Sequence, residues 1–224
     1  MLTIIVPAFN EARNVGHVIA NIAEVFAEVP GKRVIVVDDG SADDTQQVLA
    51  PLLQAHGWLE AVQHPRNLGL GAALRTGYLR CEDGVAAWLP ADGQFDAKWI
   101  LNFYRTWERT RCAIVVGNIT ASDRLRSDGL FRLFLSKAVR VLFFLRKQRK
   151  INFNGLMLFE RAGIPIGSFK ATTGSINFDI LEHFERQGGR VEYEEIAVGP
   201  RLSGESKVNN LRTYFAVLRD MLFR

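Results

Sequence analysis

The stretch VAAWLPADGQFD, residues 85–96, contains the pattern that best indicates the fold of this chain. Its apolar run stops at Pro90, and polar side chains follow at Asp92, Gln94 and Asp96. Such a run, interrupted by Pro and Gly, is typical of a buried strand whose carboxyl end carries polar groups. In an open α/β sheet, ligands bind at that end. Carboxylate and amide oxygens suit Mg²⁺ or Mn²⁺, so Asp92 and Gln94 are candidate metal ligands, although a simple Pro-Ala-Asp-Gly turn also explains them.

Strand and helix patterns alternate on both sides of this stretch. Apolar runs predict strands at 2–6, 33–37, 59–63, 85–89 and 112–117. Between them, apolar residues recur at helical spacing at 15–29, 45–53, 70–77 and 99–107. Alternation of this kind predicts an α/β fold whose strands are parallel and joined by right-handed crossovers. By Gly117 we expect five parallel strands.

The second half of the chain begins with a basic and strongly apolar segment. Residues 130–145 read LFRLFLSKAVRVLFFL, in which Arg132, Ser136 and Arg140 share one helical face. Residues 124–150 contain nine Lys or Arg and one acidic residue, Asp128. A buried helix, a solvated basic tail and a nucleic-acid surface are the alternatives. Densely spaced Phe and Leu are unsuited to following phosphates, so we expect an interfacial membrane helix at 128–147 and no nucleic-acid partner.

The remaining segments return to ordinary α/β patterns. GLMLF at 155–159 predicts a strand, and GSINFDILEHFERQGG at 174–189 predicts a helix stopped by two glycines. RVEYEEIAV at 190–198 alternates like a strand with one solvated face. Residues 206–224 place Val208, Leu211, Phe215, Leu218 and Leu222 on one side, which predicts a C-terminal amphipathic helix.

Composition restricts the cellular setting. The 224 residues have a formal charge of +4 and only two cysteines, Cys81 and Cys112, so we expect a reducing compartment. The first apolar run meets Asn10, Glu11 and Arg13 too soon for a signal peptide. No window supplies the roughly 20 uncharged apolar residues of a spanning helix. We therefore expect a chain that does not itself cross a membrane.

Several polar residues follow the predicted strands directly. Asp38 and Asp39 end one strand and Asp92 follows another, so parallel strands would bring them to one crevice, although helix capping and turn formation also explain the first two. Glu11 could simply belong to the first turn of a helix. The glycines of NLGLGAAL, residues 67–74, open a helix that could hold an anion or pack closely against a neighbour.

Taken together, the motifs resemble glycosyltransferase family 2, in particular its dolichyl-phosphate mannosyltransferase-like branch. The resemblance runs from about residue 3 to residue 208 through IIVPAFNE, VVDDGSADDT, NLGLGAALRTG, PADGQFD, RLFLS, GSINFDILEHFERQGGRV and GESKV. It implies one GT-A-type, Rossmann-like catalytic domain at 1–205, with a nucleotide-sugar-binding half at 1–117 and an acceptor-binding half at 118–205. It also implies Mg²⁺ or Mn²⁺, inversion at the sugar carbon and an acceptor at the bilayer surface.

The family motifs assign roles to individual positions. Asp92 and Gln94 match the metal-binding part of the family's Asp-Ala-Asp-x-Gln motif, whose first Asp is Pro90 here. Arg132 and Ser136 match residues expected to hold the acceptor phosphate. The nucleotide site implied by the resemblance comprises Pro7, Phe9, Glu11, Asp39 and Arg75. We add Asp38 to this site because of its position at the end of a predicted strand. The resemblance also implies a C-terminal loop with Arg201, Ser206 and Lys207 that would close over the phosphates. Asp92, Arg132, Ser136, Arg201 and Lys207 are thus the predicted catalytic set.

The implied function is transfer of a sugar from a GDP- or UDP-sugar to a polyprenyl phosphate at the cytoplasmic membrane face. The acceptor phosphate is ionised at neutral pH and needs no general base. Membrane contact would come from the chain itself or from a separate membrane partner. One alternative is a saccharide or other soluble acceptor with Asp179 as base, although an ordinary role in a helix's first turn also explains Asp179. Another is a nucleotide-sugar-binding protein without activity.

Overall fold

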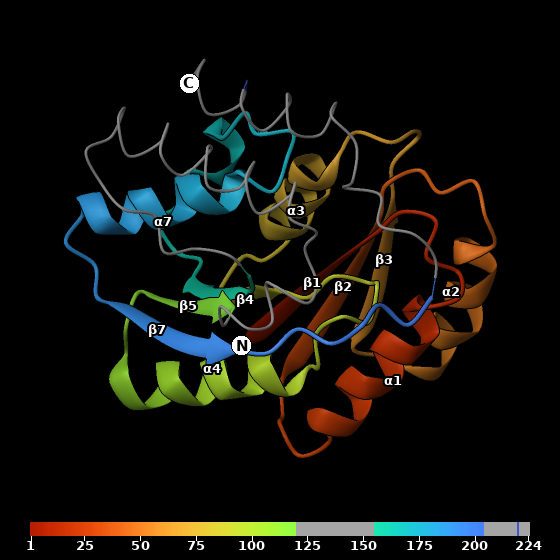
Figure 1. Ribbon diagram of the computed structural model, residues 1–224, viewed down its shortest axis with the longest axis horizontal. Helices are drawn as coiled ribbons and strands as arrows, with labels where there is room; N and C mark the ends of the chain where they lie inside the picture. The colour runs from red at the N-terminus through yellow and green to blue at the C-terminus, as the bar shows by residue number, and fades with distance from the viewer. Residues whose placement is uncertain (120–154, 204–218, 220–224) are drawn as a thin grey trace.

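The computed structural model of this chain describes residues 1–119, 155–203 and 219 (Figure 1). The predictions for the interfacial helix at 128–147, for Arg132, Ser136, Ser206 and Lys207, and for the terminal helix at 206–224 as a whole therefore lie outside the described residues. Within the described part, no helix combines the length and the apolar character needed to cross a bilayer.

The centre of the fold is a seven-stranded sheet with the order β3-β2-β1-β4-β6-β5-β7. The first four strands pair in parallel, which confirms the predicted parallel α/β arrangement. The strands are β1 (Leu2–Ala8), β2 (Lys32–Asp38), β3 (Leu59–Gln63), β4 (Val85–Trp88), β5 (Ile114–Ile119), β6 (Met157–Glu160) and β7 (Val191–Ile196).

The far side of the sheet differs from a simple series of five adjacent parallel strands. β6 lies between β4 and β5 and is antiparallel to both, whereas β7 pairs with β5 in parallel. β5 therefore runs in the same direction as β1 to β4 but is not hydrogen-bonded to them. An apolar run indicates burial and carries no information on strand direction, so the sequence could not reveal this insertion.

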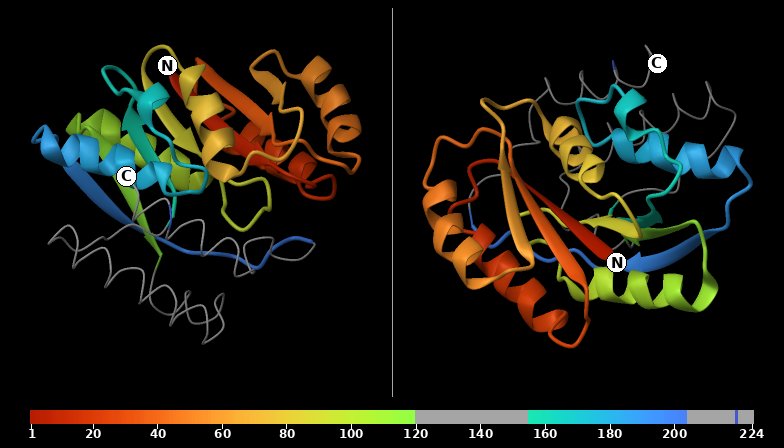
Figure 2. Two further views of the ribbon diagram at one scale, coloured as in Figure 1. Left: turned by 90° about the horizontal axis from the view of Figure 1, so that it is seen from above. Right: turned by 180° about the vertical axis from the view of Figure 1, so that it is seen from behind.

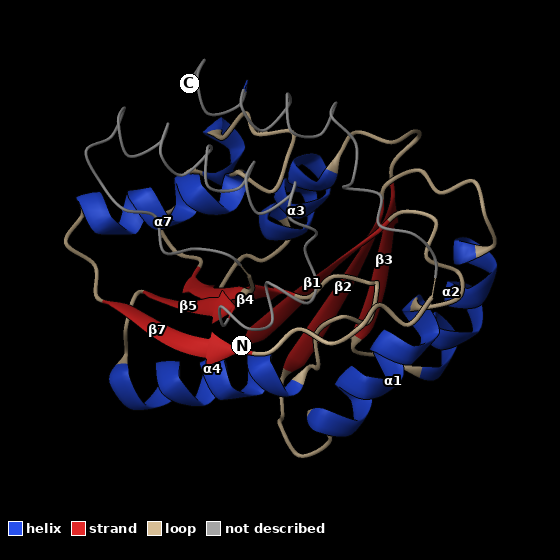
Figure 3. Cartoon of the chain, in the orientation of Figure 1, coloured by secondary structure: helices blue, strands red, loops and turns tan. Residues whose placement is uncertain are grey.

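Helices cover both faces of the sheet, as Figures 1 and 3 show. On one face lie α1 (Val15–Val25), α2 (Thr45–Ala55) and α4 (Lys98–Thr110); on the other lie α3 (Leu70–Leu79) and α7 (Ile176–Arg186), with a short 3₁₀ turn, η1 (Ile166–Ser168), between β6 and α7. The view from behind shows the same three layers (Figure 2). These layers form because successive side chains of a strand point to opposite faces of the sheet. In β1, Ile4 and Val6 face the first helical layer, while Ile5 faces the second.

Two details of the helices correct the sequence prediction. α1 ends at Val25, and the rest of its apolar pattern, the buried Phe26 and the partly buried Val29, packs against the core from the turn that follows the helix. Leu70, whose spacing predicts that it shares the apolar face of α3 with Ala73, Leu74 and Gly77, is instead 36% exposed at the first residue of that helix. Gly71 and Gly77 do lie inward, where Gly77 packs against the Ile5 side chain. For Gly69 and Gly71 of NLGLGAAL the structure supports close packing, because a Cβ would lie 2.5 Å from the Thr172 carbonyl oxygen at Gly69 and 2.4 Å from that of Thr173 at Gly71.

Candidate active site

The carboxyl ends of three neighbouring strands form one edge of the sheet. β1 ends at Ala8, which is paired with Asp38 at the end of β2, and β4 pairs with β1 on its other side. The segments that leave these strands therefore start side by side. This is the position at which open α/β sheets bind ligands, and it is where the sequence placed the strand-end acids.

The loop after β2 folds back to hold the segment after β1. Asn10 adopts a left-handed backbone conformation with φ 51°. Its amide donates to Ser41 Oγ at 2.8 Å, and its side-chain oxygen accepts from the Ala42 amide at 2.7 Å. The Glu11 amide donates to Thr45 Oγ1 at 3.0 Å. The two sequence motifs thus form one structural unit, which fixes the position of Glu11.

Asp38 lies in the turn of this unit. Its carboxylate is fully buried and accepts from the Ser41 amide at 3.0 Å and from the side-chain amide of Gln46. A buried carboxylate with these partners shapes the turn that precedes α2. The structure therefore places Asp38 in the support of the crevice.

Asp39 is the centre of a second set of contacts. Its carboxylate accepts from the backbone amides of Leu68 at 2.9 Å and Gly69 at 2.8 Å, and it lies 2.7 Å from His64 Nδ1. The other ring nitrogen of His64 lies 2.9 Å from Thr76 Oγ1 on α3. The chain Asp39–His64–Thr76 connects the end of β2 to α3, and it fixes the orientation of the Asp39 carboxylate.

Asp92 lies in the turn after β4. Its Oδ1 accepts from the Gln94 amide at 3.0 Å, while its backbone carbonyl accepts from the Leu202 amide at 3.4 Å. Burial raises the pKa of the Asp92 carboxyl; the Gln94 amide and the Arg201 charge oppose this shift, and the negative charge of Glu11 adds to it. A carboxylate that is costly to keep ionised is stabilised by a cation beside its second oxygen, Oδ2.

Arg201 brings a positive charge between the two acids. Its Nη2 forms an ion pair with Glu11 Oε1, and its Nη1 lies 3.7 Å from Asp92 Oδ2. The side chains of Glu11, Asp92 and Arg201 are only 8, 17 and 15% exposed. We call Glu11, Asp92 and Arg201 the acidic cluster. Asn14 stabilises it, because Asn14 Nδ2 donates to Glu11 Oε2 at 2.6 Å. The structure thus brings together three predicted residues that are up to 190 positions apart.

The other predicted residues take separate places. Arg75 on α3 donates from Nη1 to the backbone carbonyls of Phe169 at 2.9 Å and Ala171 at 3.4 Å, so it holds that segment against the helix. Pro7 and Phe9 are half-buried at the end of β1. Asp179 lies in the first turn of α7, where a negative charge suits the helix dipole.

Three residues of the site were not predicted. His64 contacts Asp39, Asn14 donates to Glu11, and the Ser203 carbonyl accepts from the Arg201 side chain. His64 directly follows a predicted strand, which is a weak signal in its favour. Asn14 and Ser203 carry no such signal, because their roles depend on each other across 189 positions.

The oxygen donors near Asp92 fit a hard divalent cation. The Asp92 carboxylate and the Gln94 side chain share one turn, and the Glu11 carboxylate lies on the other side of Arg201. No cluster of three or more His, Cys, Asp or Glu that could hold a metal exists among the described residues. Mg²⁺ is commonly coordinated by only one or two protein oxygens together with substrate phosphates.

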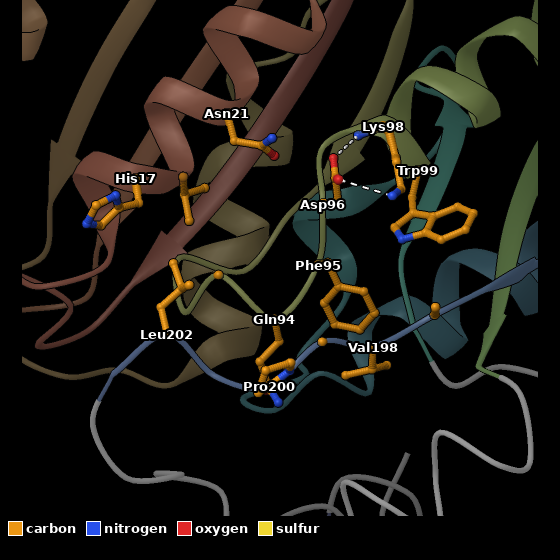
Figure 4. Close-up of a pocket in the computed structure, with 14 residues that line it drawn as sticks. His17, Asn21, Gln94, Phe95, Asp96, Lys98, Trp99, Val198, Pro200 and Leu202 are labelled. Atoms are coloured by element: carbon orange, nitrogen blue, oxygen red, sulfur yellow. Dashed lines mark hydrogen bonds and ion pairs between the residues drawn. The ribbon is translucent and has the colours of Figure 1, made fainter.

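A cavity of about 490 Å³ adjoins this turn (Figure 4). His17 and Asn21 of α1 line one side, and Val198, Pro200 and Leu202 line the other. Gln94 and Phe95 form part of its wall, but Asp92 and Glu11 do not. The cavity therefore lies beside the acidic cluster, behind the segment that carries Arg201.

A mostly parallel sheet between two helical layers, with its polar cluster at the carboxyl edge, is the GT-A fold. One solved structure with this fold is glucosyl-3-phosphoglycerate synthase from Mycobacterium tuberculosis in complex with Mn²⁺, UDP and phosphoglyceric acid. It superposes with a TM-score of 0.70 at 15% identity, covering 100% of this chain and 78% of that one.

The chain belongs to glycosyl transferase family 2, whose family model matches residues 3–171. A dodecaprenyl-phosphate galacturonate synthase from Rhizobium johnstonii is 32% identical over 132 residues, which cover 58% of this chain and 38% of that protein. A dolichyl-phosphate beta-glucosyltransferase from Trichomonas vaginalis is 27% identical over 157 residues, covering 64% of this chain and 47% of that one. The chain thus spans less than half of the length of these two relatives.

Proposed function

We propose that this protein transfers a sugar, with inversion, from a nucleotide-sugar donor to a polyprenyl phosphate at the cytoplasmic face of a membrane. The observation that carries the proposal is the convergence of Glu11, Asp92 and Arg201 at the carboxyl edge of a family 2 GT-A sheet. The names of the two relatives described above contain dodecaprenyl phosphate and dolichyl phosphate, which supports this acceptor class.

The donor site would use the segments that leave β1 and β2. Pro7, Phe9 and Glu11 lead out of β1, and the rigidly held Asp39 offers a carboxylate for the base or the ribose. The structural relative crystallised with UDP and Mn²⁺ supports a nucleoside diphosphate and a divalent ion as ligands. Asp92 and Gln94 would hold Mg²⁺ or Mn²⁺, which supplies positive charge for the departing diphosphate.

The chemistry would be a single displacement. An ionised oxygen of the acceptor phosphate attacks the anomeric carbon, a new carbon–oxygen bond forms, and the bond to the nucleoside diphosphate breaks with its electron pair. Arg201 and Lys207 would stabilise the phosphate charges, and Arg132 and Ser136 would hold the acceptor phosphate in line. Because the nucleophile is already ionised, no side chain has to remove a proton.

Membrane contact is proposed for the basic segment 124–150, through direct binding or with a membrane partner. Each Lys or Arg near an anionic leaflet contributes about 1 kcal/mol, so nine such residues are enough for peripheral association. Flotation with anionic and neutral vesicles tests this part. We expect binding to anionic vesicles at low salt and release at high salt; failure to bind at low salt would refute it.

The transfer reaction is tested with labelled GDP- and UDP-sugars, Mn²⁺ and a short polyprenyl phosphate. We expect an organic-extractable and acid-labile product with one of the donors. A product formed only with a saccharide acceptor, or no product despite tight nucleotide binding, would contradict the proposal. A thermal-shift screen of the nucleotides identifies the donor beforehand, because bound ligand stabilises the folded state.

A further inference from the structure

The segment after β7 crosses the acidic cluster and is fastened on both sides of it. We call residues 197–203 the C-terminal strap. The Gly199 amide donates to the Gln94 carbonyl at 2.8 Å, and the Leu202 amide donates to the Asp92 carbonyl at 3.4 Å. These bonds attach the strap to the turn after β4, directly beside the candidate metal ligands.

A reciprocal pair of hydrogen bonds fastens the end of the strap. Ser203 Oγ donates to Asn14 Oδ1 at 2.6 Å, and Asn14 Nδ2 lies 3.2 Å from the Ser203 carbonyl. The same carbonyl accepts from Arg201 Nε at 2.9 Å. Ser203 therefore sets both the path of the strap and the direction of the Arg201 side chain, which points between Glu11 and Asp92.

The C-terminal strap is only loosely packed against the rest of the protein. The 490 Å³ cavity lies between the strap and α1, and Leu202 is 56% exposed while it rests on Gly93. The Gly93 backbone has φ 74°, and a Cβ there would lie only 2.3 Å from Leu202 Cδ1. Displacing the strap would thus break a few hydrogen bonds without opening the core, as is typical of segments that move on binding.

We propose that Arg201 is an internal substitute for the divalent cation: its side chain occupies the charge position between Glu11 and Asp92, and it must move away from Asp92 before the ion can bind to that carboxylate. This inference rests on the proposed function for the identity of the ion. A guanidinium and a divalent cation compete for the same carboxylate oxygens, so the ion alone binds weakly. The diphosphate of the donor offers Arg201 an alternative anion, so nucleotide and ion bind cooperatively.

The test measures Mn²⁺ affinity without any transfer reaction. Wild-type protein and the Arg201→Gln variant are titrated with Mn²⁺ by calorimetry or by electron paramagnetic resonance, first alone and then with saturating UDP or GDP. Without nucleotide we expect about tenfold tighter Mn²⁺ binding to the variant, because a positive charge near Asp92 has been removed. With nucleotide we expect a larger gain in Mn²⁺ affinity for the wild type than for the variant.

Two further variants control the measurement. Ser203→Ala keeps Arg201 but removes one bond that holds the strap, and it should tighten Mn²⁺ binding in the same direction by a smaller factor. It also serves if Arg201→Gln does not fold. Arg186→Ala removes an arginine that is 65% exposed on α7 and paired with Glu182, and it should leave Mn²⁺ affinity unchanged.

Equal or weaker Mn²⁺ binding by folded Arg201→Gln and Ser203→Ala proteins would overturn the inference. That result is independent of the proposed function, which depends on product formation in the transfer assay. An enzyme that makes a polyprenyl-phosphate sugar while Arg201 has no effect on Mn²⁺ affinity would therefore refute only the substitution of the cation.

Discussion

His64 Nδ1 lies 2.7 Å from Asp39 Oδ1, and both side chains are buried at the carboxyl edge of the sheet. This contact joins the end of β2 to the segment after β3, and the second contact of His64, to Thr76 Oγ1, extends the connection to α3. The Asp39 carboxylate and the His64 ring therefore link the end of β2, the segment after β3 and α3. The side chain that is proposed to contact the nucleotide is held in one orientation by these contacts.

Replacing His64 should affect both stability and nucleotide binding. His64→Ala leaves the buried Asp39 carboxylate with one partner fewer, which costs about 1–3 kcal/mol in unfolding free energy. We also expect a higher Kd for the nucleotide, measured by calorimetry, because Asp39 loses its fixed orientation. Thr76→Val is the matched control, since it removes the outer contact and keeps the one to Asp39. Unchanged stability and affinity in His64→Ala would contradict this role.

Asp92→Asn should stabilise the ligand-free protein at neutral pH while it weakens Mn²⁺ binding. Burial raises the pKa of Asp92 in the folded state above its value in the unfolded chain, so the folded state binds this proton more tightly. Stability therefore falls as pH rises between the two values. Asparagine removes that loss. We expect a higher Tm than wild type at pH 7 and a difference that shrinks as the pH falls below the raised pKa; a lower Tm at pH 7 would contradict the argument.

Gly71→Ala should destabilise the fold although alanine favours helices. A Cβ at Gly71 would lie 2.4 Å from the Thr173 carbonyl oxygen and 2.6 Å from that of Ala171, and backbone atoms cannot easily move aside. Overpacking of this kind costs about 1–3 kcal/mol. Gly57→Ala is the control, because nothing lies within 4 Å of its Cβ position. Urea unfolding compares the two, and equal midpoints would show that residues 171–173 adjust freely.

Arg132→Ala should separate acceptor binding from donor binding. If Arg132 holds the acceptor phosphate, its loss should lower the rate of transfer by about 10²–10³, as for other groups that stabilise charge in a reaction. Nucleotide Kd should stay within about twofold. Arg190→Ala removes an exposed arginine paired with Glu192 and should change neither quantity. Loss of nucleotide affinity together with transfer would place Arg132 in the donor site.

The local patterns of the sequence predicted the elements of the described region well. β3 has the predicted bounds Leu59–Gln63, and β1, β2, β4 and β5 contain the predicted apolar runs for most of their length. Burial on two faces demands a continuous apolar run in each strand, and this demand is visible in the sequence. The position of Asp92 after such a run was visible for the same reason.

The contacts of the candidate site depend on residues far apart in the chain. Arg201 and Glu11 are separated by 190 positions, and Asn14 and Ser203 by 189. No local pattern specifies which of several arginines reaches a given acid. The strap that carries Arg201 is irregular, so its path is set by hydrogen bonds to the turn after β4 and to Asn14, the residue before α1.

For the described residues, the sequence alone was enough to predict the strands and helices, the parallel pairing of the first four strands and the acids at strand ends, because periodicity and chain order encode these properties. Only the tertiary structure decided that β6 enters between β4 and β5, that Asp38 supports a turn while Asp39 is held by His64, and that Arg201 lies between Glu11 and Asp92. These outcomes depend on strand direction and on charges brought together by folding, and neither is a property of any single segment.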